Sequence, residues 1–190
     1  QKRGVAVDID ELGGHANTVD VDTPYGRLSV DTGFIVYNPL NYPNFSALLD
    51  HFCVESVLTD MSFAASSGNG RFEYSSDFPG IVGQKRNIVK PEFWRFVSDI
   101  VRFYKHAEAL IDSPEIDGVS LGAFVKRHGY SPMMIEHHIL PMCAAIWSSS
   151  ANDIRSFPMQ AFVRFFKSHN LFSIGRKETW RTVKGGSRSY

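Results

Sequence analysis

Strand-like patterns lie at the two ends of this chain, and helical patterns lie between them. Short apolar runs typical of strands occur at residues 4–9, 18–21, 27–30, 171–174 and 180–183. Between residues 91 and 169, apolar side chains instead recur at three- and four-residue steps, as they do on one face of a helix. This order predicts an α+β fold in which a mainly helical lobe is inserted into a β-rich lobe.

The longest helical pattern begins at Pro91. Its apolar positions alternate with charged ones, and they are Phe93, Phe96, Val97, Ile100, Phe103, Tyr104 and Ala107. The spacing predicts an amphipathic helix of about five turns.

Capping residues and prolines set the expected boundaries of the later helices. Ser120 is suited to be the N-cap of a short helix that ends before a glycine. Ser131, followed by a proline, predicts a second helix start. Pro141 should kink or split that second helix, and Pro158 should open a last one.

The first half of the chain predicts two hairpins and one helix. Residues 18–21 and 27–30 flank the turn 23–26, and a second pair of strands, 61–65 and 71–74, flanks a glycine-containing turn. The helix is expected at residues 44–53, with Phe45, Leu48, Leu49 and Phe52 on one face.

Composition excludes several classes of function. The 190 residues carry 20 Lys plus Arg and 20 Asp plus Glu, so there is no basic footprint for nucleic acid. No apolar run approaches the length of a membrane span, so no integral membrane segment is expected. Cys53 and Cys143 are too few for a disulfide framework, and we expect two free, buried thiols in a reducing cytoplasm.

An acidic residue and a pair of glycines follow the first expected strand. Asp8 lies near the end of that strand, and Gly13 and Gly14 lie in the turn after it. A carboxylate in this position can accept hydrogen bonds from the ribose hydroxyls of adenosine, and glycines let backbone N–H groups approach a pyrophosphate. The signal is weak alone, because plain turns carry the same residues.

Further segments, in order along nearly the whole chain, strengthen the nucleotide interpretation. They are Leu12 to Val19, Val30 to Val36, Tyr42 to Asn44, Asp60 to Phe63, Leu140 to Ser148, Phe162 to Phe166 and Trp180 to Arg188. Together they resemble the flavin-containing amine oxidase and phytoene desaturase-like superfamily, and within it the bacterial branch of predicted NAD/FAD-binding oxidoreductases.

The resemblance implies FAD as the cofactor and assigns roles to residues at both ends of the chain. Asp8 would bind the ribose, and Gly13, Gly14 and His15 would lie beside the phosphates. Gly33, Phe34 and Ile35 would lie against the flavin ring, and Gly185 and Gly186 would return the chain to the cofactor domain. Residues 1–40 and 179–190 would then be parts of a Rossmann-like FAD-binding domain, and residues 41–178 would be the substrate-binding domain.

The implied reaction is hydride transfer to flavin from an apolar or amine substrate. The aromatic content of 13% fits an apolar substrate cavity, with Tyr37, Trp147 and Phe165 as expected lining residues. For Trp147 and Phe165, packing in the core is the alternative. No catalytic base is predicted, since hydride transfer to flavin does not require one.

Departures from the family pattern qualify this interpretation. The fingerprint G-x-G-x-x-G that should precede the acidic residue is not in the sequence. The spacing from Asp8 to Gly13 is one residue short, so Asp10 is a competing ribose ligand. We therefore expect an internal fragment that binds FAD poorly. The alternative is an FAD-free domain that binds a hydrophobic ligand or forms homo-oligomers through exposed apolar surface.

No metal site is predicted. His137 and His138 are adjacent, and neighbouring side chains on a helix point about 100° apart, so they cannot easily share one ion.

Overall fold

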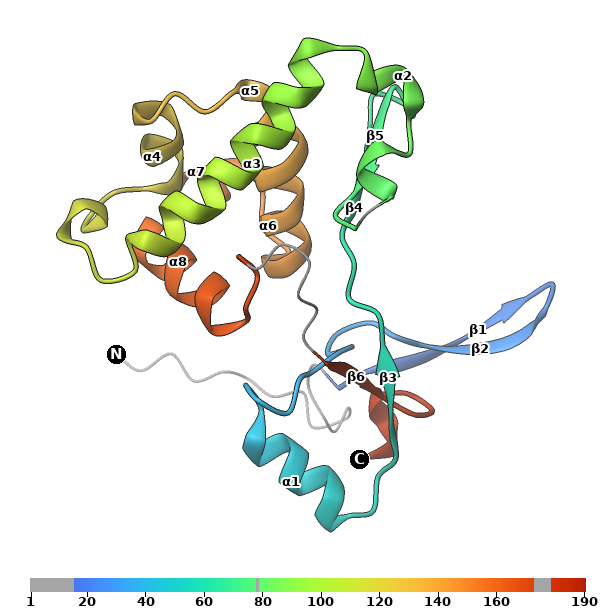
Figure 1. Cartoon of the computed structure of the whole chain (residues 1–190). Helices are drawn as coiled ribbons and strands as arrows, with labels where there is room; N and C mark the ends of the chain where they lie inside the picture. The colour runs from blue at the N-terminus through green and yellow to red at the C-terminus, as the bar shows by residue number, and fades with distance from the viewer. Residues whose placement is uncertain (1–15, 78, 173–178) are drawn as a thin grey trace. The chain divides into compact units, whose positions relative to one another are not determined.

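The computed structural model describes residues 16–77, 79–172 and 179–190 (Figure 1). The chain divides into two compact units, the first formed by Gln1–Met61 with Glu178–Tyr190 and the second by Ser62–Lys177. The chain therefore leaves the first unit once and returns to it. The mixed α and β class is confirmed, but the first boundary falls after residue 61, whereas the sequence suggested residue 40.

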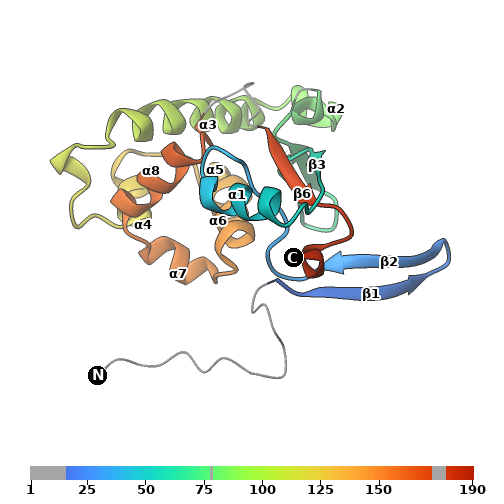
Figure 2. The ribbon, with the colours of Figure 1, turned by 90° about the horizontal axis from the view of Figure 1, so that it is seen from below.

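A long hairpin forms the start of the described part of the first unit. Strands β1 (Thr18–Thr23) and β2 (Gly26–Asp31) are antiparallel, as predicted, and Figure 2 shows them side by side along their length. Val19 pairs with Val30, and Val21 pairs with Leu28. Because side chains alternate across a strand, these four apolar residues share one face of the hairpin.

The rest of the first unit combines one helix and a second two-stranded sheet. Helix α1 (Pro43–His51) begins with a proline at its first turn. Strand β3 (Ser56–Thr59) pairs antiparallel with β6 (Trp180–Val183), and an isolated bridge between Tyr37 and Arg181 adds to this sheet. The sequence predicted β6 but not β3.

The apolar face expected on α1 is only partly buried. Leu49 is buried in a small cluster with Tyr37 and Val183, and Phe45 packs against that cluster. Leu48 and Phe52 are exposed. The predicted helix is confirmed, but only part of its apolar face is covered.

The second unit opens with a hairpin and continues with helices. The hairpin strands are β4 (Ala64–Ser67) and β5 (Phe72–Ser75), so the first strand begins three residues later than predicted. The helical elements that follow are η1 (Gly80–Val82), α2 (Lys85–Ile88), α3 (Pro91–Ala109), η2 (Pro114–Ile116), α4 (Leu121–Arg127), α5 (Pro132–Met134), the π-helix η3 (Ile135–Ile139), α6 (Leu140–Trp147), α7 (Ala151–Ser156) and α8 (Met159–Ser168).

Helix α3 supplies one side of the main core, as its spacing predicted. Phe96 and Phe103 are fully buried, and Ile100 and Tyr104 are nearly so. α3 packs against α5 and α8. Each fully buried side chain of this size contributes about 1.5–3 kcal/mol, so this face is a substantial source of stability in the unit.

Two backbone hydrogen bonds hold α4 and α8 together at their N-terminal ends. The N–H of Leu121 donates to the carbonyl of Phe157, and the N–H of Met159 donates to the carbonyl of Val119, both at 2.8 Å. The predicted cap is present, because the Ser120 hydroxyl accepts from the N–H of Ala123 at 3.2 Å.

The π-helix lies directly before Pro141, where a kink was predicted. In an α-helix the carbonyl of His137 would accept from the N–H of residue 141, which a proline lacks. The hydroxyl of Tyr74 donates to this carbonyl instead, at 3.1 Å. The hairpin thus gives this carbonyl a hydrogen bond in place of the α-helical one that the proline removes.

The next side chain, His138, lies between two tyrosines in the core. Its Nδ1 is 2.6 Å from the hydroxyl of Tyr74, and its Nε2 is 2.8 Å from the hydroxyl of Tyr104. Since Tyr74 donates to the carbonyl of His137, a neutral imidazole fits if Nδ1 donates to Tyr74 and Nε2 accepts from Tyr104. Burial lowers the pKa of His138 to about 4.

One expected strand lies outside the described residues, and another lies partly outside them. Residues 4–9 lie outside them, as do residues 173–174. Leu171 and Phe172 form a turn after α8, with Phe172 buried in the core, so the prediction of a strand there was wrong.

We predict that acid destabilises the chain through His138. Its folded pKa of about 4 lies below the usual 6.5, so between these pH values the unfolded chain binds a proton that the folded chain does not. The free energy of unfolding should therefore fall by up to about 1.4 kcal/mol for each pH unit below 6.5, and this contribution should be constant above 6.5. Urea denaturation from pH 7.5 to 4.5 measures the slope.

The matched variants are His138→Gln and His51→Gln. The first should flatten the slope, whatever its stability at neutral pH. The second removes an exposed histidine of α1 and should leave the slope as it is. An equal slope in the unmodified chain and His138→Gln would contradict the prediction.

Candidate functional site

The residues predicted to surround FAD fall into two groups. Asp8, Gly13, Gly14 and His15 lie outside the described residues, as does the competing Asp10, and their roles stay predictions. Gly33, Phe34, Ile35, Gly185 and Gly186 are all in the first unit.

A carboxylate joins the hairpin to the C-terminal turn. Asp31, at the end of β2, accepts from the hydroxyl of Thr18 at 2.6 Å and from the N–H and hydroxyl of Ser187 at 2.8 and 3.0 Å. Burial raises the pKa of Asp31, but the hydrogen bonds from Thr18 and Ser187 outweigh it and lower the pKa overall. The charged carboxylate therefore holds the residues after Gly186 against the base of the hairpin (Figure 2).

An ion pair between Arg188 and Asp20 also connects the C-terminal turn to the hairpin. The guanidinium of Arg188 donates to both carboxylate oxygens of Asp20, at 2.9 and 2.7 Å, and Arg27 adds a third contact at 3.1 Å. The Arg188 hydrogen bond, followed by one from Ser29, lowers the pKa of Asp20. Because this pair is exposed, it helps to orient the C-terminal turn but contributes little to stability.

The segment Gly33–Ile35 runs from the hairpin toward the β3–β6 sheet. The carbonyl of Ile35 accepts from the hydroxyl of Thr182 at 2.8 Å, and Phe34 packs edge-on against Tyr42 and Phe45. Within the described part of the chain, the N–H groups of Gly33, Phe34 and Ile35 donate to no protein acceptor. Gly33 and Ile35 are exposed, and Phe34 is half-buried.

The two glycines after β6 both adopt positive φ, Gly185 at 85° and Gly186 at 91°. A Cβ on Gly186 would lie 2.6 Å from Cγ2 of Thr18 and 3.0 Å from the Asp31 carboxylate, whereas a Cβ on Gly185 would meet only the Ser189 hydroxyl, at 3.2 Å. Glycine is therefore favoured at position 186 for two reasons. The backbone has a positive φ, and β1 leaves no room for a Cβ.

The three expected substrate-lining residues are divided between the units. Tyr37 is buried in the first unit, and its hydroxyl bonds to the hydroxyl of Ser56 at 2.9 Å. Trp147 and Phe165 are half-buried in the second unit, with ring centroids 5.1 Å apart. Trp147 also stacks on Phe157 at 4.6 Å, so packing explains its position, and contact with a substrate stays a prediction.

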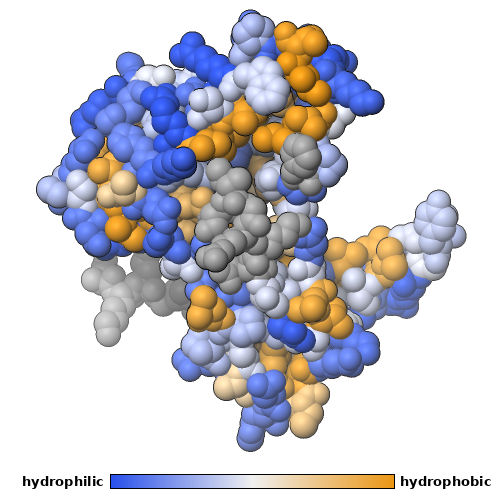
Figure 3. All heavy atoms as spheres, viewed as in Figure 1, coloured by the Kyte–Doolittle hydropathy of each residue, from blue (hydrophilic) through white to orange (hydrophobic). Residues whose placement is uncertain are grey.

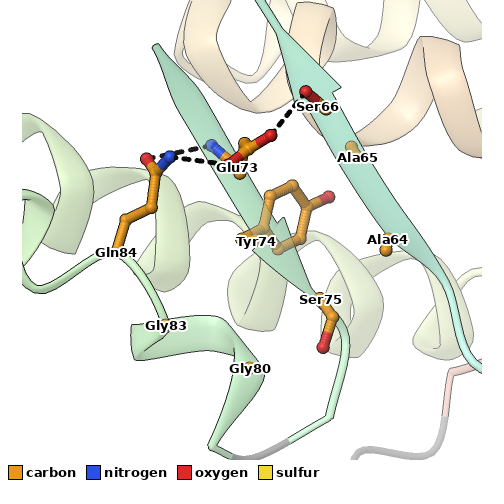
Figure 4. A pocket seen from close by; sticks show the side chains of 9 residues that line it. All are labelled: Ala64, Ala65, Ser66, Glu73, Tyr74, Ser75, Gly80, Gly83 and Gln84. Atoms are coloured by element: carbon orange, nitrogen blue, oxygen red, sulfur yellow. Dashed lines mark hydrogen bonds between the residues drawn. The ribbon is translucent and has the colours of Figure 1, made fainter. Parts of the chain in front are cut away.

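A hollow of about 430 Å³ lies elsewhere in the second unit (Figure 4). It is lined by Ala64, Ala65, Ser66, Glu73, Tyr74, Ser75, Gly80, Gly83 and Gln84. Its carboxylate is already engaged, since Glu73 accepts from Ser66 at 2.8 Å and from Gln84 at 3.1 Å. The hollow is open and does not include Trp147 or Phe165, so it offers no support for the predicted substrate site.

One group of polar side chains was not found from the sequence. His106, Glu115 and His128 each place a possible ligand atom within 4.8 Å of the others. They are nine or more residues apart and belong to no metal-binding spacing, so only the packing of the helices brings them together.

Both cysteines are free thiols, as predicted. Cys143 is buried, and burial raises its pKa to about 12. Cys53 is exposed, so the expectation that both would be buried was wrong for this residue.

Comparisons with known proteins leave the resemblance as an expectation. No protein-family model matches the chain, and no curated protein matches its sequence. In the described residues, no helix has the length and apolar character that crossing a membrane requires.

We predict that Gly186→Ala destabilises the first unit more than Gly185→Ala does. Both changes impose positive φ on an alanine, which costs about 1 kcal/mol, but only the first forces a methyl group against Thr18. The extra loss for Gly186→Ala should be about 1–3 kcal/mol in the free energy of unfolding. Equal losses in the two variants, measured by urea denaturation, would show that the close approach is unimportant.

Proposed function

We propose that this chain belongs to an FAD-dependent oxidoreductase of the flavin amine oxidase and desaturase type. The enzyme would act on an apolar or amine substrate by hydride transfer to flavin. The first unit would form one rim of the cofactor site, and the second unit would belong to the substrate side. The motif order along the chain is the basis of this proposal.

The observation that supports it best is the return of the chain to the first unit. The segment Gly33–Ile35 and the turn at Gly185–Gly186 are about 150 residues apart in sequence, and the resemblance gives both to the cofactor domain. They lie in the same unit, tied by the bonds of Thr182 to Ile35 and of Ser187 to Asp31. An inserted substrate lobe requires such a return.

The described residues are compatible with a flavin. A flat ring with carbonyl and nitrogen acceptors can accept from backbone N–H groups, and those of Gly33, Phe34 and Ile35 donate to no acceptor among the described residues. When bound, the flavin supplies the hydride acceptor. The chain's contribution is to bind and orient the ring and to exclude water from it.

The alternative is a domain without redox activity that self-associates or binds a hydrophobic ligand. The hairpin favours it, because Val19, Val21, Leu28 and Val30 are each 43–54% exposed on one face (Figure 3). In that case the protein would be colourless, and Val21→Lys would weaken its association in sedimentation velocity.

We predict that protein made from the complete reading frame carries oxidised flavin, visible in its absorption spectrum. Anaerobic addition of amines, fatty acyl chains and carotenoids should identify the substrate class by bleaching of the flavin. A folded, colourless protein that does not bind added FAD would refute the proposal.

Two variants test the position of the flavin. Ile35→Asp places a carboxylate on the proposed flavin rim and should weaken FAD binding about tenfold, which is about 1.4 kcal/mol. Leu40→Asp is the control, since Leu40 is also exposed in the first unit but has no proposed contact with FAD. Equal FAD affinity in the two variants would exclude Ile35 from the site.

A further inference from the structure

Three elements of the second unit bring a histidine, a glutamate and a histidine to one point. His106 is in the last turn of α3, Glu115 is in η2, and His128 caps the C-terminus of α4. One possible ligand atom of each lies within 4.8 Å of the others. The two imidazole rings are close to perpendicular, with centroids 4.6 Å apart.

The donor atoms of this group are available. Nε2 of His128 is buried and makes no hydrogen bond with any residue of the described chain, although it lies 3.4 Å from Oε1 of Glu115. Nδ1 of His106 is 3.0 Å from the hydroxyl of Tyr130, so Nε2 is the nitrogen of this ring that remains for a ligand. A buried nitrogen without a partner is costly, and a bound cation would remove that cost.

We propose that His106, Glu115 and His128 bind one divalent transition-metal ion of the zinc class, with water as the fourth ligand. Two imidazoles and one carboxylate are a ligand set that Zn²⁺ takes in proteins, and imidazole nitrogen disfavours Mg²⁺ and Ca²⁺. The inference does not depend on the flavin.

The distances fit after a small local shift. Tetrahedral bonds of about 2.0–2.1 Å place neighbouring ligand atoms about 3.3 Å apart, and Glu115 and His128 are already separated by 3.4 Å. The side chain of Glu115 is 45% exposed on a short turn, so it can adjust to an ion, and the two imidazoles need to approach by no more than about 1.5 Å.

The surroundings support a cation at this point. Tyr130 holds the far nitrogen of His106, as an outer partner of a metal-binding histidine commonly does. The guanidinium of Arg102 pairs with Asp99 at 2.8 Å and lies over the ring of Tyr130. Glu115 adds one carboxylate to the two imidazoles of the group.

A metal here would join α3, η2 and the end of α4. The ion would join the two ends of the segment between residues 106 and 128. Binding only to the folded chain would raise the melting temperature in proportion to the logarithm of metal concentration.

The test is titration of the full chain with ZnCl2 and CoCl2 in a Cys53→Ser background, which removes the exposed thiol. We expect one equivalent of Zn²⁺ by calorimetry, a tetrahedral Co²⁺ absorption spectrum, and a melting temperature raised by Zn²⁺ but not by Mg²⁺. Glu115→Gln and His128→Gln should each weaken Zn²⁺ at least about tenfold, and Tyr130→Phe should weaken it about tenfold.

The control is His51→Gln, which removes an exposed histidine of the first unit and should leave the affinity unchanged. Glu115 is exposed, so Glu115→Gln should keep its circular dichroism spectrum and report on binding alone. The proposal is overturned if the chain binds no Zn²⁺, or if Glu115→Gln and His128→Gln bind it as tightly as the control does.

Discussion

The pairing of β3 with β6 joins two strands that are separated in sequence by the whole of the second unit. Bringing the ends of so long a segment together costs chain entropy, although the cost rises only slowly with length. The second unit is rich in local helical contacts, which form early in folding. We therefore expect it to fold first, and the sheet and the Asp31 contacts of the first unit to be completed only when the chain returns.

The aromatic core of the second unit contains buried polar groups that need hydrogen-bond partners. Pro141 removes an N–H from the helix, the carbonyl of His137 then needs another donor, and Tyr74 supplies it from the hairpin. The hydroxyl of Tyr74 also hydrogen-bonds to Nδ1 of His138, and the hydroxyl of Tyr104 of α3 hydrogen-bonds to Nε2 of the same ring. These hydrogen bonds connect the hairpin, the π-helix and the longest helix, and buried polar groups without such partners would be costly.

Local signals made most elements predictable. The start of α4 at Ser120, that of α5 at Ser131 and the length of α3 depend on neighbouring residues alone, and all agree with the structure. β3 was missed because four residues with little alternation become a strand only beside β6. The exposure of Leu48 and Phe52 could not be foreseen either, since periodicity shows that a helix has an apolar face but not whether anything covers it.

The candidate sites also differ in how far the sequence predicts them. The Gly-Gly turn after β6 could be read from the sequence, but the contact that makes Gly186 necessary comes from Thr18, on a strand at the other end of the described chain. The group of His106, Glu115 and His128 has no sequence signature, because three separate elements supply it.

The unequal burial of the two cysteines gives this chain one natural attachment point. Thiol reagents attack through the thiolate, and the buried Cys143, with a pKa of about 12, supplies almost none near neutrality. Cys53 is exposed just after α1, at a φ of 54°. A maleimide dye added to the folded protein should therefore mark the first unit alone, so that its motions can be followed by fluorescence without any engineered residue.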